Sequence, residues 1–187
     1  MVWVGLGVLV VLALVAVWLY NRLIRAKVAV RKAWAQVDTQ LQRRHDLIPS
    51  LVASVRGYVD HERQVLDEVT RARTQAVSTS GPVAREVAED HLGVAVGRLI
   101  ALAEQHPDLK ADGNFRALQA ELSGTEDRIA FARGFANDRV ARYRELTDTF
   151  PGWLIARPFG MPRGEMFALE HERARQRVEV TFQEEAP

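Results

Sequence analysis

Residues 2–32 read VWVGLGVLVVLALVAVWLYNRLIRAKVAVRK, and the change of character within this stretch decides the architecture. No charged side chain occurs from Met1 to Asn21. Five basic residues then precede the first acidic residue of the chain: Arg22, Arg25, Lys27, Arg31 and Lys32. Because a helix rises about 1.5 Å per residue, Val2–Tyr20 is long enough to cross a hydrocarbon core of roughly 30 Å. We therefore predict a transmembrane anchor over residues 1–21, which contacts the lipid bilayer through Val2–Tyr20.

The charges beside the anchor predict its direction. Basic residues are enriched on the cytoplasmic side of membrane helices, and here they all follow the apolar run. A cleaved signal peptide is the alternative, but it needs a basic region before the apolar run and a cleavage site of small residues, and this run ends Trp-Leu-Tyr-Asn. We expect a single-pass protein of the cell membrane with its N-terminus outside and its C-terminal domain in the cytoplasm.

Residues 22–150 carry helical periodicity. Apolar side chains recur three or four positions apart over residues 30–69, 83–106 and 115–150. Turn-forming residues separate these stretches, for example Ser-Thr-Ser-Gly-Pro at 78–82 and Phe-Pro-Gly at 150–152. The short β-type run at 178–182 is not enough to define a sheet. We predict an all-α fold in which the N-terminal transmembrane helix is followed by an antiparallel up-and-down helical bundle.

Pro49 decides the predicted number of helices. Proline has no backbone N–H and biases the preceding residue away from helical conformation, and Asp46 is able to cap a new helix. We therefore favour four helices at residues 22–45, 47–78, 82–106 and 114–149. A three-helix bundle whose long first helix is kinked at Pro49 stays open as the alternative.

Two segments follow the bundle: a hydrophobic segment rich in Pro and Gly at residues 151–169 and a charged C-terminal tail at residues 170–187. Four alternating helices would bring Trp153–Met161 back to the bilayer, whereas three would leave this segment at the far end. Its aromatic and aliphatic residues suit an interfacial membrane contact. They equally suit a lid that packs on the bundle, and both interpretations stay open.

The sequence predicts no catalytic, cofactor-binding or metal site. A di-metal site in a helical bundle needs Glu three positions before His, and none of the five histidines has one. His61-Glu62 and His171-Glu172 begin like a zinc-protease motif but lack the second His. There is no cysteine, no glycine-rich phosphate loop and no Gly-x-Ser-x-Gly motif. With a formal net charge of +1, we expect no nucleic acid partner.

Several polar residues interrupt the apolar patterns, namely Arg44, His45, Asp46, Glu62, Glu126, Arg128, Arg133 and Asn137. They either occupy the solvent face or form a buried network that sets the register of the helices. Arg44 and Glu62 favour the network, because both fall on the core side of the heptad pattern. If the network exists, these two side chains could pair across the first two helices.

Three blocks of sequence resemble the LemA family: AWAQVDTQLQRRHDLIPSLV at 33–52, GYVDHERQVLDEVTRA at 57–72 and AEQHPDLKADGNFRALQAELSGTEDRIAFARGFAND at 103–138. With the apolar segment before them, they cover roughly residues 1–160 in the family's order. Asp127 stands where the family usually has Asn, and Gly134 and Ala136 replace larger residues; these departures bear on packing or on a partner surface. The resemblance implies a helical bundle, a single membrane pass and no established enzymatic activity.

Three functional hypotheses follow. The preferred one is a non-catalytic interaction or scaffold module, anchored in the membrane, whose protein partners are unknown. The second is a homo-oligomeric structural membrane protein, although the anchor lacks a Gly-x-x-x-Gly dimer motif. The third is a metal-dependent sensor or enzyme that would use His45, Asp46, His61 and Glu62.

Overall fold

The computed structural model describes residues 1–58 and 62–161, and these residues form six helices and no strand. The helices are α1 (Val2–Arg56), α2 (Arg63–Ser78), α3 (Pro82–Ala103), α4 (Pro107–Ala111), α5 (Gly113–Asp148) and α6 (Gly152–Ala156). The predictions for His61, for residues 162–169, for the run at 178–182 and for the charged tail lie outside the described residues. The expected all-α fold is confirmed.

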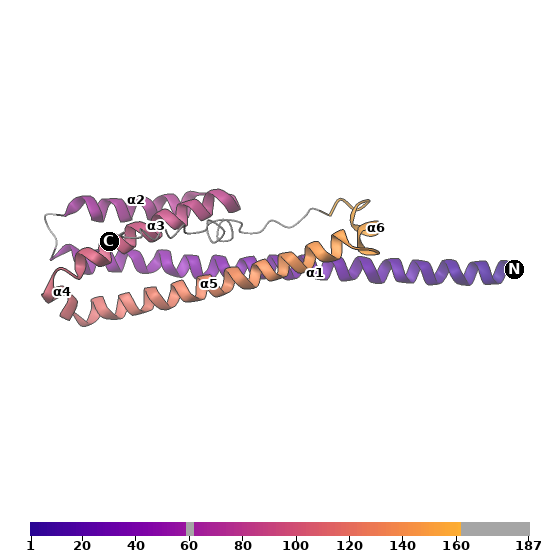
Figure 1. Ribbon diagram of the computed structural model, residues 1–187, viewed down its shortest axis with the longest axis horizontal. Helices are drawn as coiled ribbons and strands as arrows, with labels where there is room; N and C mark the ends of the chain where they lie inside the picture. Colours follow the sequence, from indigo (N-terminus) through magenta and orange to yellow (C-terminus); the bar gives the residue numbers. More distant parts are fainter. Residues whose placement is uncertain (59–61, 162–187) are drawn as a thin grey trace, which may run out of the picture.

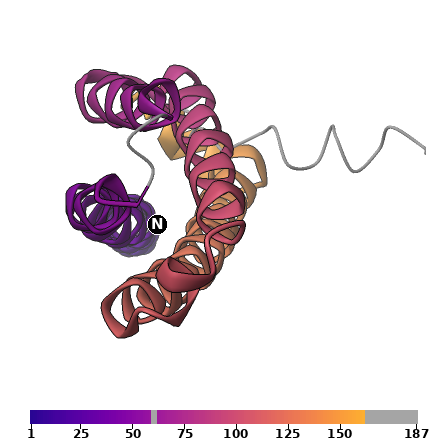
Figure 2. The ribbon, with the colours of Figure 1, turned by 90° about the vertical axis from the view of Figure 1, so that its left-hand side faces the viewer.

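The four long helices α1, α2, α3 and α5 alternate in direction along one common axis (Figure 1). α1 packs mainly against α5, α2 packs mainly against α3, and a smaller contact joins α1 to α2. Seen from the end of the bundle, α2 and α5 lie on opposite sides of α1 (Figure 2). The prediction of an antiparallel up-and-down bundle of four helices is therefore confirmed.

The break between the first two bundle helices does not lie at Pro49, and the expectation of separate helices at 22–45 and 47–78 is wrong. α1 continues through Pro49 to Arg56, and the chain turns back between Gly57 and Glu62. The three-helix alternative is also wrong, because the chain does turn back here. The third and fourth helices lie within a few residues of their predicted positions.

Proline is tolerated within α1 because a donor from another helix replaces its missing N–H. Without an N–H on Pro49, the carbonyl oxygen of His45, four residues earlier, has no partner within α1. Arg73 of α2 donates its Nε–H to this oxygen at 2.7 Å. Pro49 therefore does not end the helix. It leaves the carbonyl oxygen of His45 free to accept a hydrogen bond from α2.

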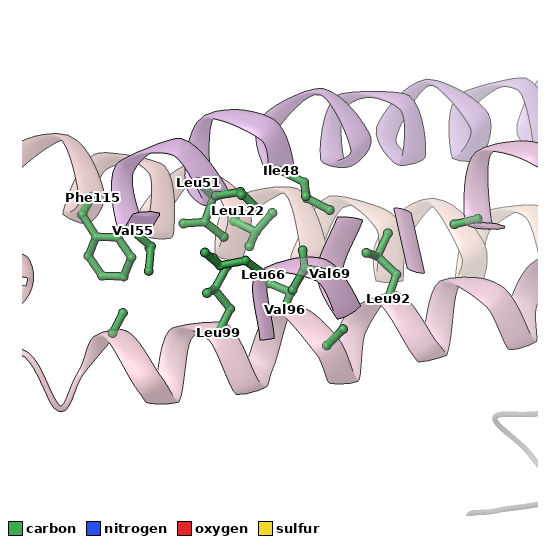
Figure 3. Close-up of a cluster of buried hydrophobic side chains, with 14 of the residues drawn as sticks. Ile48, Leu51, Val55, Leu66, Val69, Leu92, Val96, Leu99, Phe115 and Leu122 are labelled. Carbon is green, nitrogen blue, oxygen red and sulfur yellow. The ribbon is translucent and has the colours of Figure 1, made fainter. Parts of the chain in front are cut away.

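The part of the bundle farthest from the N-terminus has a core made by all four long helices (Figure 3). Ile48, Leu51 and Val55 of α1 point toward the same interior as the apolar side chains of the other helices. The largest contributions from those helices are Leu66 and Val69 of α2, Leu92, Val96 and Leu99 of α3, and Phe115 and Leu122 of α5. Each of these side chains is at most 7 % exposed, which makes this the main apolar core of the protein.

Closer to the N-terminus, α1 and α5 continue together as a two-helix stalk, by which we mean residues 22–41 of α1 with residues 129–148 of α5. Its core is narrow and consists of Ala33, Val37 and Leu41 on α1 and Ile129, Ala132 and Ala136 on α5. α3 begins alongside the stalk, where Arg85 Nη1 lies 2.7 Å from Asp38 Oδ1. Small side chains at three of the six core positions allow the two helix backbones to approach closely.

The apolar half of α1 extends beyond all other helices (Figure 1). Among the described residues, α1 is the one helix long and apolar enough to cross a membrane, and none of its most apolar stretch is buried against protein. At about 1.5 Å per residue, its 55 residues measure roughly 80 Å. The apolar segment and the bundle therefore share one continuous helix.

The hydrogen bond from Arg73 to the carbonyl oxygen of His45 predicts that Pro49 and Arg73 are energetically coupled. Arg73→Met should lower the free energy of unfolding by about 1–3 kcal/mol, because the carbonyl oxygen of His45 loses its donor. In a Pro49→Ala background the same substitution should cost much less, since the alanine supplies an N–H from within α1. Chemical denaturation of the four variants, followed by circular dichroism, measures this coupling.

Arg71→Met is the matched control, because the Arg71 Nε–H donates to the carbonyl oxygen of Asp67 on its own helix. Its effect should be small and the same in both backgrounds. Equal costs for Arg73→Met with and without Pro49 would contradict the proposed role of the His45 carbonyl oxygen.

Candidate functional site

A layer of charged side chains crosses the bundle between the four-helix core and the stalk. We call it the polar layer and define it as Arg44 and His45 of α1, Glu89 of α3 and Glu126 of α5. Arg44, His45 and Glu89 are only 5 %, 3 % and 1 % exposed, while the Glu126 side chain is 56 % exposed. Apolar residues adjoin it on both sides along α1, Leu41 toward the stalk and Ile48 toward the main core.

Glu89 is the centre of the polar layer, because both of its oxygens face groups on α1. Its Oε1 lies 2.8 Å from His45 Nε2, a hydrogen-bonding distance. Its Oε2 lies 3.7 Å from Arg44 Nη1, which in turn lies 3.3 Å from Glu126 Oε2. Arg44 thus bridges carboxylates on α3 and α5, and the pair Arg44–His45 connects α1 to both helices.

A glycine in α3 makes room for the Arg44 guanidinium. A Cβ atom added to Gly93 would lie 3.0 Å from Arg44 Nη2, closer than ordinary van der Waals contact. A larger residue at this position would therefore require the guanidinium to shift by a few tenths of an ångström. This contact explains why α3 carries a glycine in mid-helix, where glycine is otherwise unfavourable by about 1 kcal/mol relative to alanine.

We interpret the polar layer as a device that aligns the helices more than one that adds net stability. Desolvating a buried ion pair costs about as much as the attraction returns, whereas a misaligned pair would leave a buried charge without a partner. Within the described part of the chain, Arg44 Nε and Glu89 Oε2 are buried without a hydrogen-bond partner, so the layer has little tolerance for displacement. Sliding α3 by one turn along α1 would separate Glu89 from both of its partners.

Of the polar residues predicted to form a network, the structure brings together Arg44, His45 and Glu126. The predicted pairing of Arg44 with Glu62 is wrong, because Glu62 is exposed and lies just before α2. Asp46 is also exposed, and it accepts a hydrogen bond from Gln42 at 2.8 Å. His45 and Asp46 therefore point into different surroundings, although they are adjacent in the sequence.

The remaining three predicted residues lie on α5 outside the polar layer. Arg128 is on the surface, where its Nη1 lies 3.6 Å from Glu121 Oε1. Arg133 and Asn137 are half-buried along the stalk, farther toward the N-terminal half of α1.

Sequence reasoning missed Glu89, although a signal for it exists. The buried face of α3 includes Leu92, Val96 and Leu99, which follow a 4–3 spacing, and Glu89 lies three positions before Leu92. The apolar pattern over residues 83–106 also contains Val87 and Val94, which are 43 % and 57 % exposed and obscure the buried face. Extending the heptad from Leu99 toward the start of α3 would have placed Glu89 in the core.

Tyr143 is a second buried polar group, located on α5 in the stalk. It is 2 % exposed, and its hydroxyl has no hydrogen-bond partner among the described residues. Burial raises the pKa of Tyr143 above its ordinary value of 10.0, because the phenolate would lose its hydration. The neutral phenol is thus favoured in the folded state, and the resulting stability would be lost only as the pH rises through this raised pKa.

The polar layer predicts a large effect of Glu89→Gln. This substitution keeps the shape of the side chain but leaves Arg44 facing one exposed carboxylate, so we expect a loss of about 3–5 kcal/mol in the free energy of unfolding. Glu68→Gln is the matched control, since Glu68 Oε1 pairs with Arg98 Nη1 at 2.7 Å between two largely exposed side chains. The control should cost about 0–1 kcal/mol.

Denaturant unfolding of the two variants and the wild type tests this difference. If Glu89→Gln costs no more than Glu68→Gln, then the polar layer does not hold the helices in register.

The chain is similar in sequence to members of one known family. The model of the LemA family matches residues 33–182. Magnetosome protein MamQ 2 of Paramagnetospirillum magneticum is 24 % identical over 190 residues, which cover 87 % of this chain and 70 % of that protein. Protein LemA of Metamycoplasma hominis is 27 % identical over 113 residues, 58 % of this chain and 50 % of that protein. Since the family model spans most of the sequence, polar layer included, the chain belongs to the LemA family.

Proposed function

We propose that this chain is a single-pass protein of the cell membrane, whose α1 crosses the bilayer with residues 2–20 and holds a non-catalytic bundle in the cytoplasm for binding to protein partners. The observation that supports this most is the bare apolar half of α1. Leu9, Leu12 and Leu14 are each about 65 % exposed, and none of the residues in the described ranges buries this stretch of α1. Apolar surface in water costs about 25 cal/mol per Å², so a bilayer is the environment that suits this helix.

The orientation follows from the charges at the end of the apolar run. Arg22 and Arg25 are the first charged side chains of α1, and three more basic residues follow within the stalk. Basic residues beside a membrane helix favour the cytoplasmic side. We therefore place residue 2 outside the cell and the bundle inside it.

A non-catalytic role agrees with the way in which the buried charged side chains face one another inside the bundle. Glu89 Oε1 lies at hydrogen-bonding distance from His45 Nε2, and its Oε2 lies within ion-pair distance of Arg44 Nη1, so this carboxylate faces groups of the bundle itself. Asp46 and Glu62, which an enzyme or metal sensor would have combined with His45, are exposed and point elsewhere. The near-neutral net charge gives no reason to expect nucleic acid as a partner.

One observation favours a homo-oligomer as the second candidate. Phe131 of α5 is 77 % exposed on the stalk, beside a hollow lined by Gln36, Gln40 and Ala132. Large aromatic side chains on a bundle surface are typical of protein contacts. Along the stalk α1 and α5 form the main pair of helices, and they leave Phe131 uncovered among the described residues, so a second copy could cover this face with its own stalk.

Self-association through Phe131 can be measured directly. If the stalk forms the contact, native mass spectrometry of the detergent-solubilised chain should detect a dimer or larger oligomer, and Phe131→Ser should convert it to monomer. Val94→Ser, which alters an apolar side chain 57 % exposed on α3, should leave the oligomer intact. A monomeric wild type would remove the second candidate.

The proposed orientation can be tested with single cysteines, because the chain contains none. In intact cells a membrane-impermeant maleimide should label Val2→Cys and should not label Ser80→Cys, in the turn between α2 and α3. After lysis both variants should react, because both positions are exposed.

Labelling of Ser80→Cys in intact cells would reverse the orientation. Recovery of either variant in the soluble fraction after carbonate extraction would contradict membrane anchoring itself.

A further inference from the structure

The segment after α5 returns to the place where α1 leaves its apolar half (Figure 1). We call residues 150–161, which include α6, the collar. The ring of Phe159 packs on the ring of Tyr20, with their centroids 5.0 Å apart. At the start of the collar, Pro151 and Gly152 line one cavity together with Leu19 of α1. The collar therefore contacts the last residues of the proposed membrane span.

Backbone hydrogen bonds and close packing against α1 and α5 hold the collar in this position. The backbone N–H of Trp153 donates to the carbonyl oxygen of Thr149 at 3.0 Å, and that of Met161 donates to Ala156 at 3.0 Å. Gly152 is buried so closely against α5 that an added Cβ would lie 1.8 Å from the carbonyl oxygen of Leu146. α6 itself packs against both α1 and α5.

The outer face of the collar is apolar, and no residue that the structure describes covers it. Phe150, Leu154 and Phe159 are 77 %, 55 % and 62 % exposed. In a lid that packs on the bundle these side chains would be buried. Instead the collar buries Gly152 and Ala156 and presents its largest apolar groups outward.

Basic and aromatic side chains alternate at the same level. The Arg157 guanidinium lies over the Trp153 ring at 5.2 Å, and the Arg22 guanidinium lies over the Trp18 ring at 5.5 Å. Aromatic rings concentrate where hydrocarbon meets headgroups, and arginine side chains there reach lipid phosphates. This combination matches the chemistry of a membrane interface.

The depth of the collar agrees with that chemistry. The span Val2–Tyr20 measures roughly 28 Å, so Tyr20 would lie at the boundary of a hydrocarbon core of about 30 Å. Since Phe159 contacts Tyr20, the collar lies at the same boundary. If α1 spans the bilayer, the lipid around α1 therefore also lies beside the collar.

We propose that the collar is a second membrane contact, in which Phe150, Leu154 and Phe159 enter the interface of the leaflet where α1 emerges. The partner is the phospholipid surface, with Arg157 and Arg22 at the level of the phosphates. This inference rests on the proposed insertion of α1. Two contacts, one spanning and one interfacial, determine the tilt and rotation of the bundle, which a single helix leaves free.

Spin labels on single cysteines test the contact in the full-length chain. We would reconstitute three variants in nanodiscs of phosphatidylcholine and phosphatidylglycerol: Leu154→Cys in the collar, Val94→Cys on α3 and Leu12→Cys in the span. These positions have similar exposed fractions of 55 %, 57 % and 64 %, so differences in collision rate report the surroundings and not burial. Oxygen partitions into lipid, whereas a nickel chelate stays in water.

We expect the ratio of oxygen to nickel collisions at residue 154 to be severalfold higher than at residue 94 and to approach that at residue 12. A water-like ratio at residue 154 with a lipid-like ratio at residue 12 would overturn the collar contact and leave the anchor intact. Low collision rates with both reagents at residue 154 would also overturn it, because a protein surface would then cover the collar. A water-like ratio at residue 12 would overturn both proposals.

Discussion

The carbonyl oxygen of His45 is the acceptor on which the arrangement of the bundle depends. Pro49 deprives it of a partner within α1, and Arg73 of α2 supplies one at 2.7 Å. The side chain of the same residue contacts Glu89 of α3 at 2.8 Å, and its neighbour Arg44 reaches Glu126 of α5 at 3.3 Å. Two adjacent residues of α1 therefore contact all three of the other long helices.

This concentration of polar contacts lies where the apolar packing changes. Beyond it, four helices enclose a core that includes Leu51, Leu99 and Phe115. On the side nearer the N-terminus, only α1 and α5 continue, with the narrow core of the stalk. Apolar contacts alone are not directional and would tolerate a shift of the α2–α3 pair along α1. The polar layer removes that freedom, because only one register joins Glu89 to His45 and Arg44.

Most of the architecture could be predicted from the sequence, because the charge-free run and the helical periodicity are local signals. The helix break could not be placed, because Pro49 ends a helix only when no outside donor exists, and here Arg73 of another helix supplies one. The polar layer could be predicted in part, since Arg44 interrupts an apolar pattern and signals a buried charge without identifying its partner. The choice between Glu62 and Glu89 depends on where the chain turns, and the turn after α1 leaves Glu62 at the distal end of the bundle. One misplaced helix end thus led to the wrong ion pair.

The continuity of α1 has a mechanical consequence for the way this protein meets a partner. From Tyr20 to Arg44 the helix advances about 36 Å, with α5 packed along it. If Tyr20 lies at the membrane boundary, the polar layer and the four-helix core stand at a constant height above the bilayer. The stalk below them exposes Phe131, which borders Gln36 and Gln40 of α1. Because α1 carries both the span and Arg44–His45, a change of tilt in the membrane would move the whole bundle as one body.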